Sequence, residues 1–267
     1  MSLPHITHRQ HEILKLLYRF RFLERKHIQA LLGHKDKRRI SAWLKELRDT
    51  QFINWHYDAA APAVVSKPAI YFLGRNGIRS LKQAGYPYEQ LRQRYKDTAR
   101  QPDFIARCLL LADCCIHLET RTRDGAMYAY ALEADFTTSG SYTSLSDNEY
   151  IRPNLVFAKH GQDGTLDQTY YLEAFSPSTP RYMVKKKIRG YIEYLVDGDQ
   201  EDDTAAATAP IALLAFPSIA EMAYAKRYAK THLNELWDDV PDGIKIRVST
   251  TKKLRTEGLT AVIWEDI

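Results

Sequence analysis

The sequence predicts an α/β protein, α+β overall, that is divided into two domains. Three observations lead to this prediction: the first 100 residues carry a strong excess of positive charge, helical patterns fill most of that part, and strands alternate with helices over the remainder. The chain has 267 residues, of which 45% are hydrophobic and 27% charged, which is typical of a globular protein with a buried core.

The charge is divided unequally along the chain. Residues 1–100 contain 20 Lys and Arg against 8 Asp and Glu, a net charge of +12. Residues 101–267 contain 18 against 25, a net charge of −7, and the two parts give the overall +5. Because a concentrated positive field attracts polyanions, we expect nucleic acid to bind to the N-terminal part.

Three amphipathic helices are predicted at the start of the chain. Thr7 and Gln10 have the spacing of a capping box, and apolar residues follow at helical intervals as far as Phe20. A second helix is predicted before Gly33, and a third follows Asp36 as its N-cap, with a core stripe of Ile40, Leu44 and Leu47. This order of helices is typical of a helix-turn-helix.

A β-hairpin pattern follows the third helix. Two strand-like runs at 52–57 and 69–74 enclose a segment rich in Ala and Pro, with Lys67 near the expected tip, and a helical pattern at 75–85 comes next. Together with the three helices, this pattern resembles a winged helix-turn-helix, in which the third helix enters the major groove of DNA. The predicted DNA-binding residues are Lys37, Arg38, Arg39, Ser41, Lys45 and Lys67. The alternative is that this charged run forms only a solvated helix face.

The histidines of the basic part have no catalytic arrangement. We expect His8, His11, His27 and His34 to belong to a basic DNA-facing surface or to capped helices. Residues 86–104 are charged and contain prolines, which predicts a short helix and a linker. The predicted domains are therefore a winged helix-turn-helix over 1–95 and a second, α/β domain over 96–267.

The second domain alternates helices and strands. Its predicted elements are a helix over 103–123, strands at 127–135, 154–159 and 169–175, a helix over 182–195, a strand at 211–216, a helix from Ser218 to 236, and closing strands at 244–250 and 260–266. The three cysteines, Cys108, Cys114 and Cys115, have no metal-ligand spacing and are expected to be reduced core residues.

The order of these elements resembles the restriction-endonuclease-like PD-(D/E)xK core, with "RPN" leading one strand and "LEAF" in the next. Together with the upstream helices, the chain resembles the replication-relaxation family, which is associated with plasmids and other mobile genetic elements. The matching positions are Pro153 with Asn154, Glu173, and Lys187 with Tyr191. The resemblance implies a mixed-sheet, nuclease-like domain over 96–267.

The nuclease motif of this chain is incomplete. Such a site needs two carboxylates to hold Mg²⁺ and a lysine near the attacking water, but Asn154 replaces the Asp and Phe175 replaces the Lys. Lys187 lies at the edge of the following helix, so we expect it to pair with Glu173 in a remnant site of Asn154, Glu173 and Lys187. No catalytic residue, metal or other cofactor is expected on this interpretation.

An active site is the alternative. Lys187 would then be a migrated active-site lysine, Mg²⁺ would be the cofactor, and Glu133 and Asp135 could supply the missing carboxylates. The chain would in that case be a metal-dependent DNA nuclease or nickase. A third hypothesis is a regulator whose C-terminal domain senses a ligand.

The preferred hypothesis is a sequence-specific DNA-binding protein of a plasmid or other mobile element, without enzymatic activity, that acts in replication or transfer initiation or in transcriptional regulation. Its expected partners are double-stranded DNA, other replication or transfer proteins, and a second copy in a homodimer. No run of residues has the length of a membrane span and the N-terminus has no apolar signal region, so we expect a cytoplasmic protein.

Overall fold

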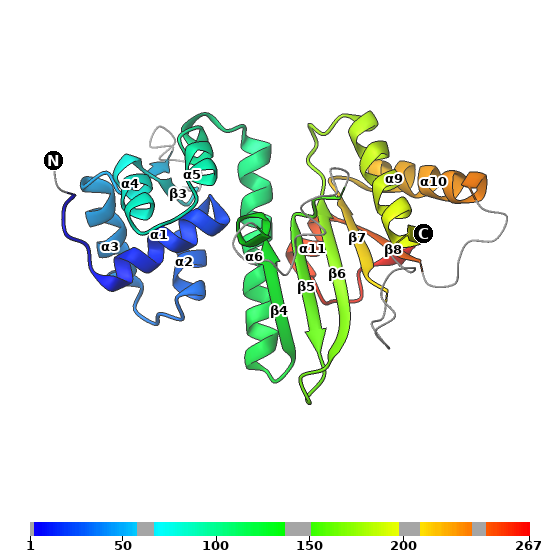
Figure 1. Cartoon of the computed structure of the whole chain (residues 1–267), viewed down its shortest axis with the longest axis horizontal. Coiled ribbons are helices and arrows are strands. Elements are labelled where there is room, and N and C mark those ends of the chain that lie inside the picture. Colours follow the sequence, from blue (N-terminus) through cyan, green and yellow to red (C-terminus); the bar gives the residue numbers. More distant parts are fainter. Residues whose placement is uncertain (1–2, 58–66, 137–150, 198–208, 237–243) are drawn as a thin grey trace. The chain divides into compact units, whose positions relative to one another are not determined.

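The computed structural model describes residues 3–57, 67–136, 151–197, 209–236 and 244–267 (Figure 1). They form two compact units, residues 1–112 and residues 113–267, which we call unit 1 and unit 2. Helix α6, Pro102–Arg123, contributes its first half to unit 1 and its second half to unit 2. The predicted α/β class is confirmed. Among the described residues, no helix combines the length and the apolar character that crossing a bilayer requires.

The three predicted N-terminal helices are present in unit 1. They are α1 (His8–Phe20), α2 (Arg25–Leu31) and α3 (Lys37–Asp49). The predicted capping box is confirmed, because the Thr7 hydroxyl accepts the N–H of Gln10 and the Gln10 side chain accepts the N–H of Thr7. Gly33 ends the second helix with a φ of +61°, a conformation that glycine adopts without a Cβ clash.

A three-stranded antiparallel sheet completes this part of unit 1. Its strands are β1 (Leu23–Glu24), β2 (Ile53–His56) and β3 (Ile70–Leu73), in the order β1-β3-β2. The sheet is followed by α4 (Arg75–Gln83), as the sequence predicts. The expected tip of the hairpin, residues 58–66, lies outside the described residues.

The short helix predicted within 86–104 is present, but the segment packs within unit 1 and is not a linker. It forms α5 (Tyr88–Arg94) and the 3-10 helix η1 (Asp97–Ala99), and both Leu91 and Asp97 are fully buried. Asp97 ion-pairs with Arg21 at the end of α1, which fixes the segment to the first helix. The sequence predicts a boundary after residue 95, whereas the contacts divide the chain within α6. Charged residues and prolines made this segment look like a linker in the sequence. The contact that buries it could not be seen there, because the partner of Asp97 lies 76 positions away.

Unit 2 is built on a six-stranded mixed sheet with the order β4-β5-β6-β7-β8-β9. The strands are β4 (Met127–Leu132), β5 (Leu155–His160), β6 (Leu166–Ala174), β7 (Ile211–Phe216), β8 (Lys245–Thr250) and β9 (Glu265–Asp266). β6, β7 and β8 run parallel, and the outer neighbours pair antiparallel. Parallel strands are buried on both faces, which agrees with the continuous apolar run of β7.

Helices cover both faces of this sheet (Figure 1). Helices α9 (Arg181–Asp197) and α10 (Ile219–Leu236) cover the face that carries Val156, Tyr171 and Leu214. The second half of α6 lies on the opposite face, where Glu119 accepts a hydrogen bond of 2.7 Å from the hydroxyl of Tyr130. All three cysteines of α6 are free and buried, as predicted.

The predicted closing strand at 260–266 is wrong over most of its length. Only Glu265 and Asp266 form a strand, and a helix that the sequence analysis missed, α11 (Thr251–Glu257), precedes this segment. The apolar residues Leu259 and Ile263 are buried by turns rather than by a strand, and the Trp264 indole N–H donates to the Leu259 carbonyl at 3.0 Å. A short apolar run such as residues 261–264 can be buried by either arrangement, so the pattern alone did not separate them. The predicted strand at 127–135 likewise ends at Leu132, where the short helix α7 (Glu133–Phe136) begins.

Candidate nucleic-acid interface

Helix α3 of unit 1 presents its cations to solvent because its apolar stripe is fixed in the core. Ile40, Leu44 and Leu47 are fully or almost fully buried, as predicted. Asp36 caps the helix by accepting the N–H groups of Arg38 at 2.8 Å and Arg39 at 3.3 Å. These backbone bonds lower the pKa of the Asp36 carboxyl, so that it stays ionised at the positive end of the helix.

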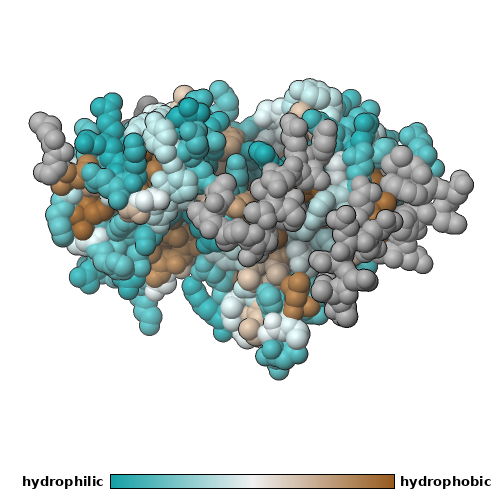
Figure 2. Space-filling view, in the orientation of Figure 1, coloured by the Kyte–Doolittle hydropathy of each residue, from teal (hydrophilic) through white to brown (hydrophobic). Residues whose placement is uncertain are grey.

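The six predicted DNA-binding residues are all exposed, and five of them lie together on α3. These five are Lys37, Arg38, Arg39, Ser41 and Lys45. Lys67 lies apart from them along the chain, three residues before β3. Among the coloured atoms of Figure 2, hydrophilic residues predominate, and apolar residues appear in separate patches.

The cations of α3 are not equivalent. The guanidinium of Arg39 lies 5.8 Å from the ring centroid of Trp43, and Trp43 packs edge-on against His34 at 5.2 Å. Among the described residues, Arg38 and Lys45 form no ion pair, so both are available for an external anion. The Ser41 hydroxyl donates to the Lys37 carbonyl at 3.1 Å, which ties it to its own helix. We therefore expect Arg38 and Lys45 to contribute more to anion binding than Arg39.

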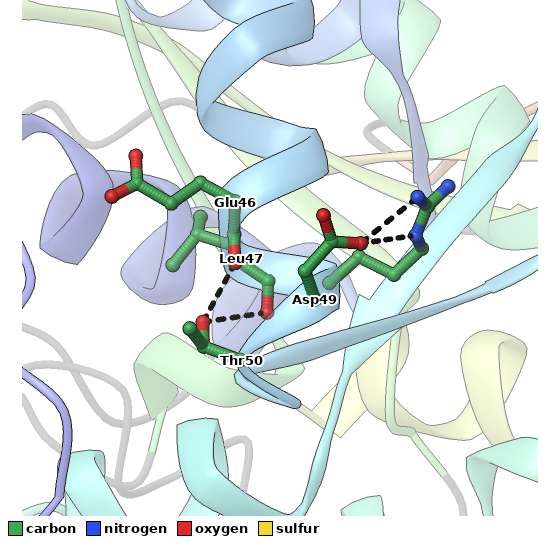
Figure 3. A network of polar contacts seen from close by, with 5 residues as sticks. Glu46, Leu47, Asp49 and Thr50 are labelled. Carbon is green, nitrogen blue, oxygen red and sulfur yellow. Dashed lines mark hydrogen bonds and ion pairs between the residues drawn. The ribbon is translucent and has the colours of Figure 1, made fainter.

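A second set of residues beside α3 was missed by the sequence analysis. Arg48, in the last turn of α3, lies with its guanidinium 4.3 Å from the ring centroid of Trp55 on β2. Figure 3 shows the end of this helix, where the Thr50 hydroxyl bonds to the carbonyls of Glu46 and Leu47 and the Asp49 carboxylate accepts two bonds. Those two bonds come from Arg48, at 3.0 and 3.3 Å, and they hold its guanidinium in place. The signal in the sequence was the position of Arg48 three residues after Lys45 and four after Leu44, at the half-buried edge of the helix.

The four histidines named in the sequence analysis differ in burial and contacts. His27 is buried, and its Nδ1 accepts the N–H of Glu24 at 3.2 Å, so it belongs to a capped helix rather than to a surface. His34 Nδ1 accepts the N–H of Asp36 at 3.1 Å, just before α3. His8 is exposed and pairs with Glu12 at 3.3 Å. Burial and the nearby charge of Lys15 lower the pKa of His11.

The three residues predicted as a remnant site are brought together in unit 2. Glu173 on β6 is 4% exposed and lies under α9. Lys187 of α9 donates to Glu173 Oε2 at 3.0 Å, which confirms the predicted ion pair, and it also donates to the Arg152 carbonyl at 3.0 Å. The Tyr191 hydroxyl donates to the same Oε2 at 3.4 Å. Burial raises the pKa of the Tyr191 phenol, and the negative charge of Glu173 raises it further.

Asn154 lies beside Glu173, but its hydrogen bonds are made to main-chain groups of β6. Its N–H donates to the Leu172 carbonyl at 2.8 Å, and its side-chain Oδ1 accepts the N–H of Ala174 at 2.8 Å. These two bonds extend the pairing of β5 with β6 on either side of Glu173 along the strand. The amide oxygen that would replace a carboxylate ligand is therefore already used within the sheet.

This donor set does not fit Mg²⁺, the ion that a PD-(D/E)xK site implies. Mg²⁺ is bound through carboxylate oxygens, but Asn154 carries no charge and the Glu173 carboxylate is paired with an ammonium group. Glu133 and Asp135, the predicted substitutes, lie at the start of α7, where Asp135 Oδ2 accepts the N–H of Leu132 at 2.8 Å. Within the described part of the chain, no three His, Cys, Asp or Glu side chains come together as metal ligands.

The comparisons with known proteins identify the family. The family model described as replication-relaxation matches residues 14–209, which is well over half of the chain. The chain belongs to the replication-relaxation family. The match begins within α1 and includes α3, the Glu173 strand and the Lys187 helix, so it extends over parts of both units. Neither the curated proteins nor the solved structures include a match.

Proposed function

We propose that this member of the replication-relaxation family is a sequence-specific DNA-binding protein that acts in the replication or transfer of a plasmid or other mobile element, or in its transcriptional regulation. Unit 1 is its winged helix-turn-helix, with α3 as the recognition helix and the β2–β3 hairpin as the wing. Unit 2 is a nuclease-like domain that does not cut DNA. The family name supports a role connected with replication.

The exposed cationic face of α3 carries this proposal. Asp36 fixes the start of the helix, and the burial of Ile40, Leu44 and Leu47 directs Arg38 and Lys45 outward. In helix-turn-helix proteins the N-terminal residues of the recognition helix contact the base edges. Arg38 is close enough to that end to read a base, whereas Lys45, two turns later, is placed to meet a phosphate.

The charge of the N-terminal part supports double-stranded DNA as the partner. Residues 1–100 have a net charge of +12, and each phosphate that a Lys or Arg neutralises releases condensed counterions. Binding should therefore weaken steeply as salt concentration rises. Other replication or transfer proteins and a second copy of the chain remain proposed partners, and the cytoplasm remains the proposed location.

The contacts of Glu173 favour the non-cutting role of unit 2 over the alternative of a nuclease or nickase. Lys187 reaches Glu173, as the migrated-lysine hypothesis requires, but it neutralises the carboxylate that would hold the metal. A test by cleavage separates the two hypotheses. Supercoiled plasmid incubated with Mg²⁺ or Mn²⁺ should stay intact, and cleavage that is lost in Glu173→Gln would establish the nuclease instead.

The binding experiment starts with selection of DNA from a random duplex pool by the wild-type protein. The affinity of the selected site is then measured at several salt concentrations for wild type and for Arg38→Ala with Lys45→Ala. We expect the double variant to lose about 1–3 kcal/mol of binding free energy if Arg38 reads a base. Its affinity should also depend less steeply on salt concentration, because the phosphate contact of Lys45 is removed.

Arg92→Ala is the matched control, because Arg92 is an exposed cation of the same unit that pairs with Glu89 on α5. It should leave affinity nearly unchanged. Unchanged affinity together with an unchanged salt slope in the α3 double variant would contradict the proposal. A selection that yields no enriched sequence would contradict sequence-specific binding.

A further inference from the structure

Three aromatic side chains form a strip on one face of the sheet in unit 1. Trp55 on β2 stacks on Tyr57 with ring centroids 5.0 Å apart and an angle of 20° between the ring planes. Tyr71 on β3 is the register partner of Trp55, with its ring centroid 6.2 Å away. We call Trp55, Tyr57 and Tyr71 the aromatic strip.

Cations of two helices border the aromatic strip. The Arg48 guanidinium lies 4.3 Å from the Trp55 centroid and is held by Asp49. Burial raises the pKa of the Tyr71 phenol, while the nearby charges of Arg48 and Arg25 act in the opposite direction. Arg25 belongs to the first turn of α2 and bonds to Gln29 at 2.7 Å. Guanidinium groups from two helices thus lie near the rings of the aromatic strip.

Packing inside the protein does not account for the whole strip. The opposite face of the sheet carries the core contacts, where Phe72 stacks on His56 at 4.7 Å and contacts Phe22. The Trp55–Tyr71 pair can be explained as a cross-strand pair that stabilises the sheet. Tyr57, however, lies beyond the last paired position, His56 with Ile70, and is 48% exposed. A large ring at that position stabilises the fold little.

We propose that the aromatic strip binds unpaired nucleotides, with a base stacking on the exposed ring of Tyr57 and with Arg25 meeting a phosphate. Trp55 supports the Tyr57 ring from below, because Tyr57 and Arg48 already cover the Trp55 ring. Aromatic rings bordered by cations are the usual surface for single-stranded nucleic acid, because every base has a face that can stack. This inference rests on the proposed function, in which unit 1 binds DNA. Since Arg48 lies in the last turn of α3, the strip continues the surface that would contact the duplex. The substrate class is therefore DNA in which a duplex adjoins unpaired bases.

The test compares three fluorescent probes: a single strand of 20 thymidines, a blunt 20-base-pair duplex, and the same duplex with a tail of thymidines. Anisotropy titrations are made with wild type, Tyr57→Ala, Tyr57→Phe and Tyr88→Ala. Tyr88 is the matched control, because it is a 51% exposed tyrosine of unit 1 that also contacts a cation, Lys82 at 4.6 Å.

We expect wild type to bind the tailed duplex about tenfold more tightly than the blunt one. Tyr57→Ala should lose most of that advantage and most of the binding to thymidines, without a change for the blunt duplex. Tyr57→Phe keeps the ring and should behave as wild type, and so should Tyr88→Ala. If melting curves show that Tyr57→Ala is unfolded, Tyr57→Leu replaces it, because leucine keeps apolar bulk without a planar ring.

Two results would overturn the inference. Equal affinities of wild type for tailed and blunt duplex, or an equal loss for both in Tyr57→Ala, would show that the strip does not bind unpaired bases, although the proposed function would stand. Failure of wild type to bind any of the three probes at low salt would overturn both.

Discussion

Asp97 in unit 1 and Glu173 in unit 2 are both buried carboxylates, but they are neutralised in different ways. Asp97 is fully buried and pairs with Arg21 and, at 3.6 Å, with Arg100. Both guanidinium groups also lie over the ring of Phe104, at 4.6 and 4.9 Å. Among the described residues, Glu173 pairs with the ammonium group of Lys187, whose side chain is 22% exposed. The cations of Asp97 are thus held from several sides, whereas Lys187 borders solvent.

This difference sets the cost of breaking each pair. Removal of one partner from a buried pair is expensive because the other charge stays in a medium of low dielectric. Arg21 is 8% exposed and cannot turn to water without disturbing the end of α1, whereas Lys187 can extend its flexible stem to solvent. Removing the carboxylate of the Asp97 cluster should therefore destabilise the protein more than removing that of the Glu173 pair.

The largest effect is expected for Asp97→Ala. The substitution leaves the Arg21 guanidinium buried without its carboxylate, which should lower the free energy of unfolding by about 3–5 kcal/mol. Chemical denaturation curves measure it. Glu89→Ala, which removes an acid from an exposed pair with Arg92, is the control and should change stability by less than about 1 kcal/mol. Similar curves for the two variants would show that loss of the Asp97 carboxylate does not leave a costly buried charge.

A smaller loss is expected for Glu173→Ala. It should cost about 3 kcal/mol, at the low end for a buried pair, because Lys187 can reach solvent. The double change Glu173→Leu with Lys187→Met should recover much of that loss, since apolar residues of similar size replace both charges. A Glu173→Ala protein that is fully stable but has lost a wild-type cutting activity would instead indicate an active nuclease.

A pH effect is expected at Tyr191, which is buried against Glu173 and Tyr171. Its folded pKa is raised above the unfolded value of about 10, so the folded state keeps the phenol proton that the unfolded state releases. Stability from this group is fully present below about pH 10 and is lost as the pH rises further through the folded pKa. Tyr191→Phe should reduce the slope of stability against pH above pH 10 and change stability near pH 7 by only about 1 kcal/mol. An unchanged slope would contradict this role.

The smallest effect concerns Mg²⁺. Because Lys187 already neutralises Glu173, millimolar Mg²⁺ should leave the melting temperature of wild type unmoved, whereas a true site would stabilise the protein by mass action. Asn154→Asp tests the Mg²⁺ site more sharply than wild type does. It restores the second carboxylate of the nuclease motif, and Asp can still accept the N–H of Ala174. A saturable rise in wild type that vanishes in Glu173→Gln would contradict the prediction.

Much of the local structure could be predicted because its causes lie within a few residues. The Thr7 and Asp36 caps and the Ile40, Leu44 and Leu47 stripe are encoded within one or two turns of helix, and the structure confirms them. The Glu173–Lys187 pair could also be predicted, because the strand and the helix that follows it are consecutive and their buried stripes fix which side chains meet.

The tertiary structure alone decided the rest. Asp97 meets Arg21 across 76 positions, and no local pattern distinguishes that buried acid from one in a linker. The segment before Glu265 has the apolar run of a short strand, but it forms turns that bury Leu259 and Ile263, and the Ile263 carbonyl accepts the hydroxyl of Ser249 at 2.8 Å. Arg48 reaches Trp55 only because the turn after α3 brings β2 back beside the last helical turn. Composition and periodicity determine which side of an element is buried. Only the folded chain determines which distant side chain pairs with a buried charge or packs against a ring.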